Sequence, residues 1–154
     1  MSHTSKVTDE RWMRLALEQA KQAESEGEVP VGAVVMIDEK IIGQGRNQSL
    51  GFHDPSAHAE IMAMRQAGKT LSNYRLPGST LYVTLEPCMM CAGAILHARI
   101  ERVVFGTRDE KTGAVGSIAN LLENPLANHR CRVTADILSE QSRLLLANFF
   151  QQRR

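Results

Sequence analysis

The stretch Leu85-Glu86-Pro87-Cys88-Met89-Met90-Cys91 places two cysteines three residues apart, directly behind a proline. Proline fits the first turn of a helix, where its missing N–H removes no hydrogen bond, so the stretch predicts a helix over residues 87–98. Residues at i and i+3 share one helix face, and the positive end of the helix dipole favours thiolate over thiol. Cys88 and Cys91 therefore form half of a candidate metal site.

The other half lies upstream, in Pro55-Ser56-Ala57-His58-Ala59-Glu60, which also has the composition of a helix start. One imidazole and two thiolates make a three-ligand zinc site, and catalytic zinc keeps its fourth position for water. Glu60 would then be free for proton transfer. On a straight helix, however, side chains two residues apart point about 200° away from each other. His58 and Glu60 can reach one pocket only if the first turn is not fully helical.

Each part of this pattern also has a structural interpretation. An isolated histidine is more often a partly buried core residue, and an isolated C-x-x-C pair is as readily redox-active or part of a four-ligand structural zinc site. A structural site needs a fourth protein ligand. The chain has no second C-x-x-C pair, and four other candidates lack pair spacing with one another, namely Cys131, His53, His97 and His129. Together with the family resemblance given below, the combination favours a catalytic site.

The size and composition are those of one globular domain, with 154 residues, 43% hydrophobic and 23% charged, and we expect a single domain over residues 1–154. No apolar run approaches the roughly 20 residues of a membrane-spanning helix, and residues 1–6 lack the apolar core of a signal peptide. We therefore expect a cytoplasmic protein without a membrane partner. Cys131, the third cysteine, is expected to be a structural or idle thiol.

The formal net charge is +1, whereas a protein that binds nucleic-acid phosphates normally has a clear basic excess. The charges are unevenly distributed. Residues 1–28 hold four basic and six acidic side chains, and residues 130–154 hold five arginines against Asp136 and Glu140. This asymmetry fits a basic edge near the C-terminus or an ordinary solvated helix surface, and both interpretations stay open.

Helices and strands alternate along the chain. We expect helices over residues 9–24, 55–68, 87–98, 118–122 and 136–152, with Thr8 capping the first. We expect strands over residues 31–37, 41–45, 80–85, 102–107 and 131–134, and loops over residues 46–55 and 108–116. The first two strands form an antiparallel hairpin, whereas strand–helix–strand crossovers make later pairs parallel. The pattern predicts an α/β domain with a mixed sheet covered on both faces.

The combination H-x-E followed by P-C-x-x-C is the known signature of zinc-dependent nucleobase deaminases. Further stretches between about residue 12 and residue 150 support the same assignment, namely Glu28-Val29-Pro30-Val31-Gly32-Ala33-Val34, Asn47, His53-Asp54-Pro55-Ser56-Ala57-His58-Ala59-Glu60-Ile61, Asn73-Tyr74-Arg75-Leu76, Thr80-Leu81-Tyr82-Val83-Thr84-Leu85-Glu86-Pro87-Cys88-Met89-Met90-Cys91-Ala92-Gly93-Ala94 and Val103-Val104-Phe105-Gly106. On these residues the chain resembles the cytidine/deoxycytidylate deaminase superfamily. Within it, the chain is most similar to the bacterial tRNA-specific adenosine deaminases.

This resemblance implies a three-layer α/β/α fold with a mixed five-stranded sheet. It implies hydrolytic deamination of the wobble adenosine in a tRNA anticodon stem-loop to inosine, on Zn²⁺ held by His58, Cys88 and Cys91. Glu60 would be the general acid and base, because it fills the glutamate position of the motif. The resemblance also implies a homodimer.

Substrate contacts follow from the resemblance alone. It implies that Asn47 hydrogen-bonds the flipped nucleoside and that Val31 lies on the pocket wall. A loop-stabilising role for Asn47 is the alternative. The loop that contains Asp109 and the C-terminal Arg153 would contact the RNA. Outside the metal ligands, we expect Met89 and Met90 to pack their helix and Glu86 to anchor the loop before it through hydrogen bonds.

Two competing functions remain. The same chemistry could act on a free base or nucleoside such as guanine, cytosine or cytidine, which would need no basic surface. A non-catalytic, zinc-stabilised RNA-binding module is the other possibility. Glu60 argues against the module, because a structural metal site does not require that carboxylate.

Overall fold

Five strands form one mixed sheet in the order β2-β1-β3-β4-β5, in a computed structural model that describes residues 5–125 and 129–153. The strands are β1 (Gly32–Ile37), β2 (Lys40–Arg46), β3 (Thr80–Leu85), β4 (Arg102–Thr107) and β5 (Arg132–Thr134). β1 pairs antiparallel with both β2 and β3, and β3–β4 and β4–β5 are parallel pairs. The mixed five-stranded sheet is confirmed. The position of β1 between β2 and β3 was not expected.

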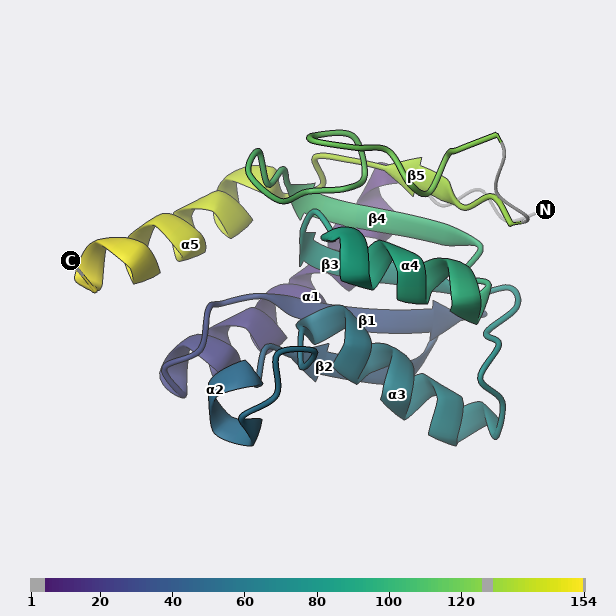
Figure 1. Ribbon diagram of the computed structural model, residues 1–154, viewed down its shortest axis with the longest axis horizontal. Helices are drawn as coiled ribbons and strands as arrows, with labels where there is room; N and C mark the ends of the chain where they lie inside the picture. The colour runs from purple at the N-terminus through teal and green to yellow at the C-terminus, as the bar shows by residue number, and fades with distance from the viewer. Residues whose placement is uncertain (1–4, 126–128, 154) are drawn as a thin grey trace.

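Four main helices cover the two faces of the sheet, and a short one lies beside it. The helices are α1 (Lys6–Ser25), α2 (Ser49–Phe52), α3 (Ala59–Leu71), α4 (Met89–Ala98) and α5 (Ser139–Gln152). In Figure 1, α3 and α4 cross in front of the sheet and α1 runs behind it. Among the described residues, no helix combines the length and the apolar character needed to cross a lipid bilayer.

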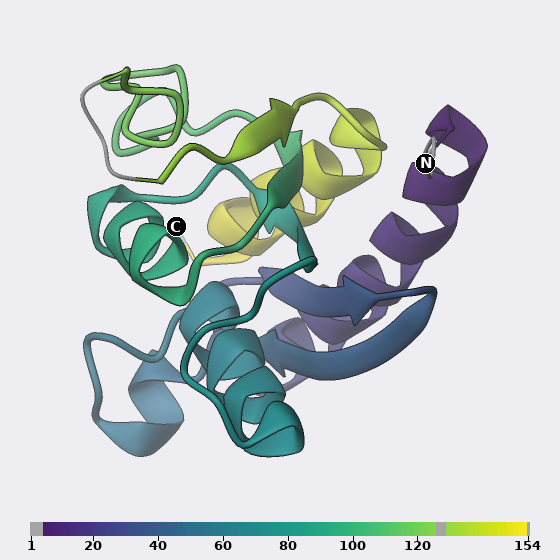
Figure 2. The same ribbon diagram turned by 90° about the vertical axis from the view of Figure 1, so that its right-hand side faces the viewer.

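The strands send alternate side chains to opposite faces, as the period of two requires. Val35, Val83 and Phe105 belong to the core cluster beneath α3 and α4. Val34 and Tyr82, their neighbours along the chain, belong to a second cluster under α1. Figure 2 shows the sheet between these two sets of helices. The expected three-layer α/β/α arrangement is therefore confirmed.

On the α1 face, the core contains a buried polar network. Asp9 accepts hydrogen bonds from Arg102 Nη1 at 2.9 Å and Nη2 at 2.7 Å, and from the Tyr82 hydroxyl at 2.9 Å. Arg102 Nη2 also donates to Thr134 Oγ1 at 2.8 Å. Burial and the nearby Asp9 charge raise the pKa of Tyr82. The network joins α1 to β3, β4 and β5 from one side of the sheet.

On the opposite face, glycines of β2 let α3 lie close to the sheet. A Cβ added at Gly45 would stand 2.5 Å from the Ala63 amide nitrogen and 2.7 Å from the Ala59 carbonyl oxygen. Real Cβ atoms do not approach backbone that closely, so only glycine fits. Gly45 therefore brings the first turn of α3 close to the sheet edge where β2 ends.

Several predicted helix boundaries are wrong. Thr8 lies inside α1, and Ser5 is the cap, because Ser5 Oγ accepts a hydrogen bond from the Thr8 amide at 3.2 Å. α5 starts at Ser139, after two residues with positive φ, Asp136 at 65° and Leu138 at 53°. Such left-handed residues interrupt a right-handed helix.

Two segments differ in type from the prediction. The expected loop over residues 46–55 contains α2, and the expected helix over residues 118–122 is absent. There the Leu121 amide donates to the Ala114 carbonyl at 2.9 Å, and Val115 pairs with Asn120 in an isolated bridge. These backbone groups bond across the loop, so they are not available for a local helix.

Candidate active site

The two stretches that carry the candidate metal ligands meet at the N-termini of α3 and α4. His58 precedes α3 with φ −75° and ψ 156°, and Cys88 precedes α4 with φ −79° and ψ 178°. Both are N-cap residues on extended backbone, so the predicted helix starts at Pro55 and Pro87 are wrong. Because His58 is not helical, the 200° separation from Glu60 does not apply. The condition for a common pocket is therefore met.

Contacts with a distant loop explain why α4 begins after Cys88. The Ala114 amide donates to the Pro87 carbonyl at 2.8 Å, and Cys88 pairs with Gly113 in an isolated bridge. These contacts hold residues 86–88 extended. The first intrahelical bond then runs from the Ala92 amide to the Cys88 carbonyl at 2.8 Å.

His58, Cys88 and Cys91 present three potential metal ligands at one point. His58 Nδ1 lies 3.6 Å from Cys88 Sγ and 3.5 Å from Cys91 Sγ, and the three donor atoms lie within 4.8 Å of one another. Donors that bind one zinc ion at about 2.0–2.3 Å in a tetrahedron stand roughly 3.5–3.8 Å apart. The observed separations and the donor types therefore fit a single zinc ion.

The electrostatics of the group favour a thiolate. Hydrogen bonds from Cys91 and His58 lower the pKa of Cys88 to about 4. The hydrogen bond to Cys88 and burial raise the pKa of Cys91, and the hydrogen bond to Cys88 also raises the pKa of His58. The shifts therefore favour the thiolate form at Cys88. The N-termini of α3 and α4 add positive potential at the same place.

Glu60 lies in the first turn of α3 and is 4% exposed. Burial raises its pKa to about 7. A carboxyl group in that range can accept and release a proton at neutral pH, which is the requirement for a general acid and base.

A cavity of about 110 Å³ brings most of the predicted site residues together. Six of them line it, namely Val31, Asn47, His58, Glu60, Cys88 and Asp109. Cys91 is fully buried beside the other two ligands. Leu85, Glu86 and Thr112 also line the cavity, and sequence patterns did not mark Leu85 or Thr112 as site residues.

Arg153 lies in an adjoining groove instead. The groove has a volume of about 410 Å³ and shares Val29, Asn47 and His58 with the cavity. The Arg153 guanidinium stacks 3.7 Å from the centre of the Phe149 ring, and its Nη2 donates to the Gly27 carbonyl at 3.4 Å. The C-terminal end of α5 therefore forms one wall of the groove beside the cavity. Arg154 lies outside the described residues.

Asn47 also has a structural role. Its Oδ1 accepts a hydrogen bond from the Ala59 amide at 2.8 Å, at the start of α3. The alternative interpretation of Asn47 as a stabilising residue is thus supported by a contact. A direct contact with a substrate would use its amide nitrogen.

A buried acid that sequence patterns did not identify holds the short helix α2. Glu28 accepts from the Leu50 amide at 3.1 Å and the Gly51 amide at 2.8 Å, and it lines the outer groove. The sequence signal that could have identified Glu28 is its position just before a buried strand, in Glu28-Val29-Pro30-Val31. Glu86, expected to anchor the loop before α4, does accept hydrogen bonds, but from the loop that follows β4, for example from the Asp109 amide at 3.0 Å.

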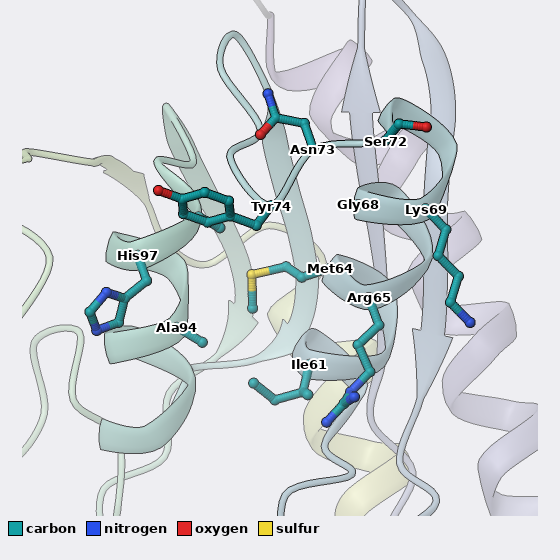
Figure 3. A pocket seen from close by; sticks show the side chains of 11 residues that line it. Ile61, Met64, Arg65, Gly68, Lys69, Ser72, Asn73, Tyr74, Ala94 and His97 are labelled. Carbon is teal, nitrogen blue, oxygen red and sulfur yellow. The ribbon is translucent and has the colours of Figure 1, made fainter.

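A larger cavity of about 720 Å³ lies between α3 and α4, outside the metal-ligating group. Figure 3 shows Ile61, Met64 and Tyr74 around it, with Arg65 and His97 at its sides.

Met89 and Met90, expected to pack α4, are instead 59% and 39% exposed. These two apolar side chains of α4 therefore lie on the outer surface of the chain, in contact with solvent.

Comparisons with known proteins agree with the geometry. The sequence matches the MafB19-like deaminase family over residues 7–154. It is 55% identical over 147 residues to the "tRNA-specific adenosine deaminase" of Haemophilus influenzae, which covers 95% of this chain and 85% of that protein. A solved structure from a study of A-to-I editing by tRNA:A34 deaminases at the wobble position of transfer RNA has a TM-score of 0.85 and 42% identity, covering 88% of this chain and 99% of the other. A guanine deaminase from Nitrosomonas europaea, with a TM-score of 0.77 and 24% identity over 91% of this chain and 83% of the other, is alike in fold alone.

Proposed function

Since this chain belongs to the MafB19-like deaminase family and to the tRNA-specific adenosine deaminases, we propose that it deaminates the wobble adenosine of a tRNA anticodon to inosine. One observation carries the proposal. A buried carboxyl group and a group of three candidate metal donors lie at the same small cavity, and that cavity shares lining residues with an adjoining groove. This arrangement supports hydrolytic deamination of a base that enters through the groove.

Zinc is the proposed metal, and His58, Cys88 and Cys91 would hold it. When bound, zinc lowers the pKa of a water molecule so that the water becomes a nucleophile near neutral pH. The chain's contribution is to present one nitrogen and two sulfur donors, with Cys88 already favoured as a thiolate.

Glu60 would move the protons. Its carboxylate would take one proton from the attacking water and deliver it to N1 of the adenine ring, while the hydroxyl oxygen bonds to C6. It would then carry the remaining hydroxyl proton to the exocyclic nitrogen, so that the C6–N bond breaks, ammonia leaves and a C6 carbonyl forms. Because burial raises the pKa of Glu60 to about 7, the side chain can both accept and return that proton.

The substrate would reach Glu60 as an extruded nucleotide. A base in an anticodon loop is already exposed, so its removal from the stack requires at most a few kcal/mol. Val31, Asn47 and Asp109 would surround the base in the cavity, and Arg153 would contact the RNA in the outer groove.

A homodimer and a cytoplasmic location complete the proposal. The exposed Met89 and Met90 and the cavity between α3 and α4 would suit contact with a second copy of the chain. The expected compartment is the cytoplasm, where tRNA is used. Each protomer would be one deaminase domain.

The deciding experiment offers the zinc-loaded protein an anticodon stem-loop with a wobble adenosine. Free adenosine, guanine, cytosine and cytidine are tested separately, and the products are identified by mass spectrometry. We expect inosine in the stem-loop and no change in the free compounds. A stem-loop with guanosine at the same position is the matched control. Deamination of a free base beside an unchanged stem-loop would instead indicate an enzyme of small-molecule metabolism.

A further inference from the structure

Glu86 is a buried acid, 2% exposed, located between β3 and the metal-ligating Cys88. Its carboxylate accepts four hydrogen bonds, and all four come from the loop over residues 109–117. Oε1 accepts from the Asp109 amide at 3.0 Å and from the Ser117 hydroxyl. Oε2 accepts from the Val115 and Ser117 amides at 3.0 Å each. The loop is therefore folded around this side chain.

The backbone at Glu86 and the backbone of the loop both support the contact between the Glu86 carboxylate and the loop. The Glu86 amide donates to the Thr107 carbonyl at 2.9 Å. A Cβ added at Gly113 would stand 2.3 Å from Glu86 Cδ, so the loop leaves no room for a side chain there. The Glu86 carboxylate therefore sets the distance between the loop and the start of α4 together with the backbone contacts of Pro87 and Cys88 to Ala114 and Gly113.

This loop supplies one wall of the catalytic cavity through Asp109 and Thr112. The Asp109 carboxylate is itself engaged, because Oδ1 accepts from the Lys111 and Thr112 amides at 3.1 Å each and Oδ2 accepts from the Thr112 hydroxyl at 2.7 Å. The loop is consequently held by its own hydrogen bonds, and the four Glu86 contacts are the side-chain contribution to its position relative to His58 and Glu60.

We propose that Glu86 is a positioning residue for the reaction, which holds the loop over residues 109–117 at the separation that admits the target base and excludes others. The proposal rests on the proposed function and deepens it, since it assigns a determinant of base selection. Glu86 is not a second acid or base. Both of its oxygens accept hydrogen bonds from the loop, whereas Glu60 faces the metal-ligating group.

The test uses Glu86→Gln, which keeps the size of the side chain. Glutamine presents an amide NH₂ where one carboxylate oxygen accepted two donors, so buried N–H groups of the loop lose their acceptor. Such losses correspond to roughly 5- to 100-fold in an equilibrium constant. We expect KM for the wobble-adenosine stem-loop to rise by about that factor, kcat to fall less, and discrimination against a wobble cytidine to weaken.

Asp9→Asn is the matched control. Asp9 is as buried as Glu86 and accepts three side-chain hydrogen bonds, but it lies on the α1 face of the sheet. The Asp9→Asn variant should unfold at a lower temperature than the wild type, and below that temperature its KM and base discrimination should be unchanged. Hydrogen exchange of the Val115 and Ser117 amides should accelerate in Glu86→Gln and stay unchanged in Asp9→Asn. Ser117→Ala, which removes one donor, should give a smaller change in the same direction.

Two results would overturn the proposal. If Glu86→Gln loses bound zinc, the residue acts through the cysteines and not through the loop. If its loop amides exchange faster while KM and discrimination match the wild type, the loop position is irrelevant to selection. The wild-type protein in the same assay reports separately on the proposed function. The ratio of variant to wild type, taken on whichever substrate the wild type deaminates, reports on Glu86.

Discussion

Asp9 and Glu60 are both buried acids in the first turn of a helix, but they lie on opposite faces of the sheet. On the α1 face, Asp9 forms an ion pair with Arg102 and accepts from the Tyr82 hydroxyl. On the α3–α4 face, no arginine or lysine of residues 5–125 and 129–153 forms an ion pair with Glu60. Its neighbours are His58 and the two cysteines, and burial raises its pKa to about 7.

The contrast shows that the partner of a buried acid, and not its burial, separates a structural role from a chemical one. Asp9 joins three strands to α1, through Tyr82 on β3 and through Arg102 on β4, which also bonds to Thr134 on β5. Glu60 has the cavity and lacks the guanidinium. Variants that remove each acid should therefore affect different measurements.

The largest expected effect is the loss of turnover when Glu60 is replaced. Glu60→Gln should reduce kcat by roughly 10²- to 10⁴-fold, because the proton carrier is lost. The unfolding temperature should not fall, since a buried amide is less costly than a buried carboxylate. Single-turnover assays on the stem-loop, zinc analysis and thermal unfolding measure these three quantities. Turnover near the wild-type rate would contradict the assigned role.

The second largest expected effect is the loss of stability when Asp9 is replaced. Asp9→Asn should lower the free energy of unfolding by about 3–5 kcal/mol, because it removes the carboxylate that balances a buried guanidinium. Urea unfolding measures the loss, and kcat per folded molecule should equal that of the wild type. Thr134→Val, which removes a single hydrogen bond to Arg102, should cost only about 1 kcal/mol. A large fall in kcat for Asp9→Asn would mean that the two faces are coupled.

The third effect tests how β2 places the site. Gly45→Ala should destabilise the protein by about 1–3 kcal/mol and weaken zinc retention, because the added methyl group pushes on Ala59 and Ala63 beside His58. Gly43→Ala is the control. Its methyl group would meet the Ala63 carbonyl at 2.3 Å and the Ala67 amide at 2.7 Å, farther along α3. We expect a similar loss of stability with zinc retained during dialysis against a chelator. Equal zinc loss in both variants would show that α3 moves as one rigid body.

The smallest effect concerns the outer groove. Arg153→Ala should lower stability by only about 0.5–1 kcal/mol, the typical contribution of an exposed cation–π contact such as that with Phe149. If Arg153 also binds a phosphate, stem-loop affinity should fall and its salt dependence should decrease by about one released counterion. Affinity measured at several salt concentrations distinguishes the two roles. If the salt dependence of stem-loop affinity is unchanged, Arg153 has only a structural role and links α5 to Gly27.

The pairing of Cys88 with Cys91 and the strands of the sheet were predictable because their signals are local. Cys88 and Cys91 are close in sequence, and the strands show runs of buried residues of the correct length. α2 was missed because its Leu50 and Gly51 amides bond to Glu28, about 22 residues upstream. The helix expected over residues 118–122 was wrong for a similar reason, since its backbone groups bond within a loop that Glu86 holds.

The residue types available for chemistry, and the alternation of buried positions that builds the sheet, can be read directly from the order of amino acids. How those side chains converge depends on contacts between segments that are distant in the chain. His58 and Cys88 stand at N-caps because distant backbone and side-chain groups complete the hydrogen bonds of the segments that contain them, Asn47 for the first turn of α3 and the loop at Ala114 for Pro87. Local helix signals cannot contain that information, because the bonding partners lie 12 and 27 residues away in the chain.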